Sequence, residues 1–143
     1  MILDKNLTLS ENQAITATAI SENVIQIPAS GTVHGEGAAI PRNLGPGQEV
    51  PVLIQATEDF NNLTSLTITL ETADNAALST NNEVLFSTGA IPLADLVAGY
   101  RTAVRVLPDF VLRDFVGIRY TVTGTNPTTG KVTAAIGTEV NAG

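Results

Sequence analysis

The sequence contains no cysteine, no tryptophan and a single histidine, and its only other aromatic residues are two tyrosines and four phenylalanines. The absence of cysteine excludes disulfide bonds, thiolate metal sites and cysteine nucleophiles, and it fits folding in a reducing compartment. A Ser–His–Asp triad would have only His34 as its base, and a metal site would have to use oxygen ligands. We therefore expect that the protein is not an enzyme and binds no cofactor.

Long apolar runs are also missing. No window approaches the ~20 apolar residues of a membrane-spanning helix. The first residues, MILDKNLTLSENQ, carry a charge by residue 4 and have no apolar run of signal-peptide length. We therefore expect no membrane partner and no secretion signal.

Positive charge is scarce, because seven basic residues face fourteen acidic ones and give a net charge of −7. Phosphate backbones favour clustered Lys and Arg, so we expect no direct nucleic-acid binding. The basic residues are unevenly spread, and such asymmetry permits contact with a complementary surface. Five of them lie after residue 100: Arg101, Arg105, Arg113, Arg119 and Lys131.

The sequence is rich in short segments with the period-two alternation of β-strands. In residues 65–71, Leu66, Ile68 and Leu70 share one face, which we expect to be core. The other face carries short hydroxyl side chains, which we expect to form an outer wall facing water. Further strands are predicted at 14–20, 24–27, 50–57, 83–87, 102–108, 116–124 and 131–137, with the last two joined as a hairpin.

Many short strands separated by Gly- and Pro-rich turns predict an all-β fold, an antiparallel β-sandwich, with the jelly roll and the immunoglobulin-like sandwich as the leading options. A short helix is expected near residues 92–98. We interpret residues 1–143 as one domain with an extended N-terminal segment (about 1–28) and a long Gly-rich loop (about 29–49). Such a domain without a catalytic constellation is typical of a binding or structural module.

Several stretches in this order resemble a known family. They are LDKNLTLSENQAITATAISENVIQI, VPVLIQATEDFNNLTSLTITLETADN, AIPLADLVAGY and IRYTVTGTNPTTGKVTAAI, and together they span nearly the whole chain. The chain resembles the capsid cement proteins of tailed bacteriophages of the Bordetella podovirus type, the Bbp16 family. The most specific parts of the resemblance are SENQAITATAISENVI and IPLADLVAGY.

The resemblance implies a jelly-roll-type domain on the outer surface of the virion, reached from the host cytoplasm during assembly. Its partners would be a major capsid protein of HK97-like fold and a second copy of itself in a homodimer, with no catalysis and no cofactor. The alternative that we keep is a carbohydrate- or receptor-binding β-sandwich of a phage fibre or spike.

Three groups of residues are candidates for partner contacts. The N-terminal segment is one, because termini need contacts to be ordered, although it can equally be an ordinary first strand. The Gly-rich loop is the second, because a long loop can reach a lattice, although it can equally be a mobile loop. Exposed arginines that meet acidic patches are the third. The residues concerned are Leu7, Leu9, Ile15 and Ile20; His34, Glu36 and Arg42; and Arg101 and Arg105.

Overall fold

The structure, a computed structural model, describes residues 2–26, 34, 35, 37, 51–104 and 113–138 of the 143-residue chain. Within these ranges the regular elements are β-strands and one 3₁₀ turn, so the expected all-β fold is confirmed. In chain order they are β1 (Ile2–Ala14), β2 (Ala19–Ile20), β3 (Ile25–Gln26), β4 (Val52–Glu58), β5 (Leu63–Ala73), β6 (Glu83–Pro92), η1 (Leu93–Asp95), β7 (Arg101–Val104), β8 (Phe115–Gly124) and β9 (Lys131–Thr138).

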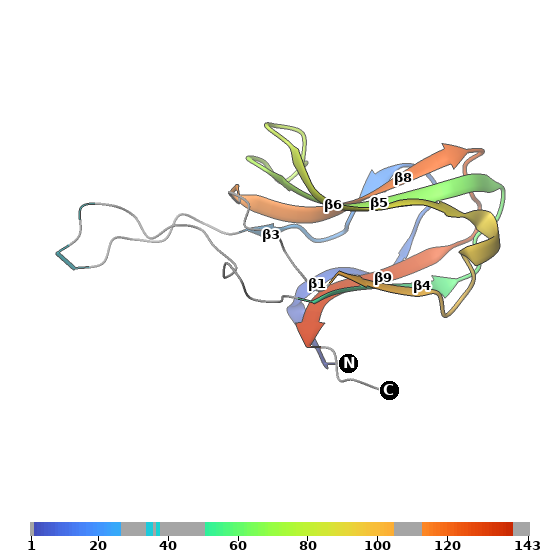
Figure 1. Cartoon of the computed structure of the whole chain (residues 1–143), viewed down its shortest axis with the longest axis horizontal. Coiled ribbons are helices and arrows are strands. Elements are labelled where there is room, and N and C mark those ends of the chain that lie inside the picture. Colours follow the sequence, from blue (N-terminus) through green and yellow to red (C-terminus); the bar gives the residue numbers. More distant parts are fainter. Residues whose placement is uncertain (1, 27–33, 36, 38–50, 105–112, 139–143) are drawn as a thin grey trace.

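The strands form two antiparallel sheets that lie over each other as two layers (Figure 1). One sheet has the order β1-β9-β4-β7, and the other has the order β2-β8-β5-β6 with β3 also paired to β8. If β2 and β3 are taken as one interrupted strand, the described part of the chain has eight strands. The outermost strands in the sequence pair with each other (β1 with β9), and the pairing continues inward: β2 and β3 with β8, β4 with β7, and β5 with β6. This is the pairing of a long hairpin rolled into a jelly roll, as expected.

Three sequence-based expectations need correction. The strand expected at 14–20 is broken, because β1 ends at Ala14 and bends follow before β2 begins. The helix expected near 92–98 is only the single turn η1. The hairpin expected from 116–137 does not form, because β8 and β9 belong to different sheets. The turn between them reverses the chain but also carries it from one layer to the other, and turn residues alone predict only the reversal.

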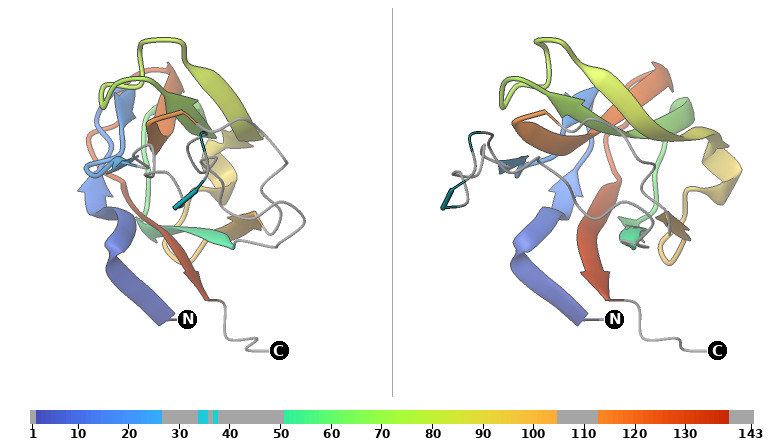
Figure 2. Two further views of the ribbon diagram at one scale, coloured as in Figure 1. Left: turned by 90° about the vertical axis from the view of Figure 1, so that its left-hand side faces the viewer. Right: turned by 60° about the vertical axis from the view of Figure 1, so that its left-hand side comes forward.

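Beyond the two layers, β1 and β9 continue together as a two-stranded ribbon (Figure 2). Within the described ranges, β4 pairs with β9 only as far as Ile136, whereas Ile2 still pairs with Thr138. The longest edge strand therefore lies at this side of the molecule.

The core lies between the sheets and is built from the alternation read in the sequence. The side chains of Leu66, Ile68 and Leu70 are buried in it, as expected. The hydroxyl face on the opposite side of β5 is only partly open to water, because Thr67 and Thr69 are half-buried and Glu71 is buried. The expectation of a simple water-facing wall is therefore wrong at the Glu71 end, where neighbouring side chains cover the sheet.

Polar side chains connect the two sheets inside the core. The Tyr120 hydroxyl of β8 donates to the Ser10 hydroxyl of β1 over 2.8 Å, and Ser10 donates to Oε1 of Gln13 over 2.7 Å. The Gln13 amide in turn donates to the carbonyl of Ile20 over 2.9 Å. Burial raises the pKa of Tyr120 well above its ordinary value, the hydrogen bond to Ser10 lowers it by less, and the charge of Glu22 adds to the rise.

The Tyr120 hydroxyl predicts a specific pH dependence of stability. At neutral pH, Tyr120→Phe should lower the free energy of unfolding by about 0.5–1.5 kcal/mol, because Ser10 loses its donor. Because the folded pKa lies above the unfolded one, the contribution of the neutral hydroxyl is complete below about pH 10 and is lost as the pH rises further. Urea unfolding of both proteins at several pH values should show the wild-type advantage shrinking above pH 10. A pH-independent difference would contradict this role of Tyr120.

Candidate interaction surface

The structure corrects two of the candidate contact residues. Leu9 and Ile15 have no exposed surface and belong to the core between the sheets. A side chain that is fully enclosed by its own chain has no area left for a partner. The N-terminal segment is therefore, at these two positions, a strand and a bend of the sandwich.

The remaining candidates are scattered over the molecule. Leu7 is 36% exposed on β1, and Ile20 is half-buried on β2 of the other sheet. His34 is exposed, and so is Arg101 at the start of β7, on the far edge of the sheet from β1. The structure thus brings no two of these four side chains together on one described element. Three candidates lie outside the described residues: Glu36, Arg42 and Arg105.

Two further arginines are used inside the fold. Arg119 on β8 forms an ion pair with Glu71, with Nε 3.1 Å from Oε2, and donates to the Leu78 carbonyl over 2.8 Å. Arg113 lies 2.9 Å from the Glu83 carboxylate and 3.4 Å from that of Asp74. These contacts fasten the connection between β5 and β6, so neither arginine is a free cation for a partner.

The connection between β5 and β6 covers one end of the outward face of the β2-β8-β5-β6 sheet. Leu78 has a positive φ of 53° and yet is buried. A Cβ atom at Gly117 would lie 3.0 Å from the Leu78 Cδ1 atom, so the glycine leaves the space that this side chain fills. The covering of Glu71 by its own chain follows from this packing.

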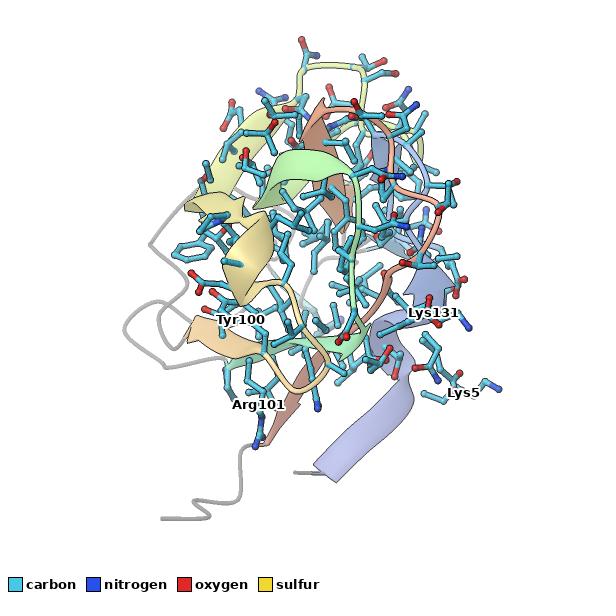
Figure 3. The ribbon with its side chains drawn as sticks, turned by 90° about the vertical axis from the view of Figure 1, so that its right-hand side faces the viewer. Lys5, Tyr100, Arg101 and Lys131 are labelled. Atoms are coloured by element: carbon cyan, nitrogen blue, oxygen red, sulfur yellow. The ribbon has the colours of Figure 1, made fainter. Side chains whose placement is uncertain are left out.

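Three of the connections between strands at the opposite end of the sandwich lie at the right of Figure 1 and face the viewer in Figure 3. We call this region the loop end and define it as residues 59–62, 92–100 and 125–130. Two of these connections contain left-handed glycines, Gly99 with φ 96° and Gly130 with φ 133°.

Asn61 holds the 125–130 connection. Its Oδ1 accepts hydrogen bonds from the backbone N–H groups of Thr128 (2.8 Å) and Thr129 (3.2 Å), and its Nδ2 donates to the Thr128 hydroxyl (2.7 Å). The Gly130 N–H also donates to the Glu58 carboxylate over 3.0 Å. A side chain that satisfies two successive backbone donors fixes the turn as a helix cap would.

The 92–100 connection is held by the same short segment. The Asp59 carboxylate accepts from the Ala98 N–H over 2.7 Å, and the Phe60 N–H donates to the Leu96 carbonyl over 3.0 Å. The Leu96 side chain is buried. The next side chain, Val97, points outward and is 48% exposed. The loop end is therefore a hydrogen-bonded platform that presents an apolar side chain.

The sequence reading missed Val97. A signal for it exists in IPLADLVAGY, because Leu96 and Val97 adjoin in a tight connection and only one of two such neighbours can point into the core. The sequence does not tell which of the two is the anchor.

Three cations labelled in Figure 3 lie on the β1-β9-β4-β7 sheet. Arg101 and Lys131 begin strands next to the loop end, whereas Lys5 lies on β1 toward the other end of the sheet. Lys131 lies 3.5 Å from the Glu58 carboxylate, and both side chains are exposed enough for water to weaken the pair. Among the described residues, Arg101 has no ion-pair partner.

The described part of the chain offers no metal centre and no membrane span. No three His, Asp or Glu side chains of these residues gather closely enough to hold a metal ion. The described ranges also contain no helix with the length and hydrophobicity needed to cross a bilayer.

The geometry of the loop end suits binding through a preformed surface.

Two glycines test how the loop end is built. At Gly130 an added Cβ would overlap the Phe60 ring, whereas at Gly99 it would meet nothing within 4 Å, although both have positive φ. Gly99→Ala should cost about 1–2 kcal/mol of unfolding free energy from backbone strain alone. Gly130→Ala should cost about 1–3 kcal/mol more from overpacking. Equal losses in chemical denaturation would refute the packing of Gly130 on Phe60.

Comparison with known proteins adds the family. The family model described as Bbp16 matches residues 9–136, from the middle of β1 to near the end of β9. This span includes strands of both sheets and all three connections of the loop end. No curated protein matches the chain. Because the family model covers most of the sequence, the chain belongs to the Bbp16 family and is a phage-related protein.

Proposed function

We propose that the chain is a capsid cement protein. It binds the outer surface of a phage head whose shell is built by a separate major capsid protein of HK97-like fold, and it stabilises the lattice of that protein. The observation that carries the proposal is the Bbp16 match over residues 9–136, because it includes strands of both sheets rather than one motif. The role is structural, without catalysis or cofactor.

The charge of the chain supports a place outside the shell. The net charge is −7, and among the described arginines Arg113 and Arg119 are already paired with carboxylates of the same chain. A wall that faces packaged DNA would repel the DNA phosphates if it carried this charge. On the outer surface, the same charge costs little. The virion exterior, reached from the host cytoplasm during assembly, is therefore the location that we propose.

The rigidity of the loop end supports the same role. A protein that clamps neighbouring subunits gains most when its contact surface is already ordered, because less conformational entropy is lost on binding. Asn61 and Asp59 provide that order. Many copies on one shell, paired as homodimers, would add their contacts, so each contact can be weak while the lattice holds.

Heads assembled with and without the chain provide the test of this function. Heads that carry it should co-sediment with it and should release their DNA at a higher temperature than heads that lack it. Restoring the purified chain should restore that temperature. Heads of equal heat resistance would contradict the proposal. Specific hits on a glycan array, together with absence from the shell, would instead favour the carbohydrate- or receptor-binding alternative.

A further inference from the structure

Three large apolar side chains are exposed among the residues that the structure describes. Leu7 lies on β1, Val84 on β6 and Val97 in the connection between η1 and β7, and they are 36%, 52% and 48% exposed. An isolated exposed apolar residue needs no explanation. What separates the three is therefore their surroundings and how firmly their backbone is held.

Val84 has charged neighbours and lies on an irregular edge. The adjacent Glu83 pairs with Arg113, and in the β5 register Val84 stands opposite Glu71. The β6 strand also has two register shifts against β5, which are devices that blunt an edge strand. This edge is suited to remaining in water.

Val97 has small neighbours and a fixed backbone. Ala94, Ala98 and Gly99, its small neighbours in the sequence, are exposed as well. The Val97 N–H donates to the Asp95 carbonyl over 3.0 Å, and the Gly99 N–H donates to the Ala56 carbonyl over 2.8 Å. A rigid apolar projection loses little entropy on docking, which is the property of an interface anchor.

Carboxylates border this projection. Asp95 is exposed, and Asp59, also exposed, accepts from the Ala98 N–H. Among the described residues neither carboxylate has an ion-pair partner. A surface that receives Val97 would therefore be complementary if it combined an apolar recess with a basic side chain at its rim.

We infer that the projection formed by residues 94–98, with Val97 at its tip, is the part of the chain that docks on the capsid shell. Its site on the shell is a shallow apolar recess with a Lys or Arg at the rim. This inference rests on the proposed function and adds to it the contact surface and the chemistry of the partner.

The experiment measures binding of the purified chain to heads that were assembled without it. Val97→Asp should weaken binding roughly tenfold or more, because it places a charge in an apolar contact. Val84→Asp is the matched control, since it makes the same substitution at an equally exposed valine, and it should bind within about twofold of the wild type. Asp95→Asn should weaken binding less and should reduce its dependence on salt.

Each result separates the inference from the proposed function. Leu7→Asp tests the rival surface on β1. If Val97→Asp binds like the wild type, or if Leu7→Asp or Val84→Asp weakens binding as much, the inference is wrong while the cement function stands. If the wild type does not bind heads, both are wrong. Thermal unfolding verifies that each variant is folded, and Val97→Ala, which should weaken binding in the same direction, replaces the Asp variant if that one does not fold.

Discussion

The contact between the apolar faces of the two sheets is the interaction on which the other features of the molecule depend. Each sheet has one face that cannot stay in water, and Leu66 of one sheet and Val132 of the other are buried between the layers. Connections such as 125–130 pass from one layer to the other, and the strands that they join supply apolar side chains to the same interior from opposite sides. The loop end is the place where these crossings meet, and its hydrogen bonds hold them to one another.

The sequence predicts the layers better than the connections between them. Period-two alternation correctly identified the core face of β5, because that signal depends only on which side of a strand is apolar. It could not show that β8 and β9 lie in different sheets, since both pairings present the same alternation. It also left open whether Leu9 and Ile15 contact a partner or belong to an ordinary first strand, because an apolar residue near a terminus has the same pattern whether its own chain or a partner covers it.

The polar residues divide between holding the fold and remaining on its surface. Arg119, Arg113 and Asn61 are taken up by contacts within the chain, and none of these contacts could be read from spacing, since the partners are 30 or more residues away. With these groups satisfied, the loop end presents Val97 between small residues and carboxylates. The proposed docking surface is thus what remains after the internal contacts are made, and it is ordered before any partner arrives.

The central claim is that this sandwich sits on the outside of a phage shell with its loop end toward the shell. A cryo-EM map of the head at a resolution that shows strands tests it most directly. The account predicts density outside the shell that fits both sheets, with residues 92–100 and 125–130 against the major capsid protein. A shell without this density, or density in which the loop end faces solvent and the opposite end touches the shell, would contradict the account.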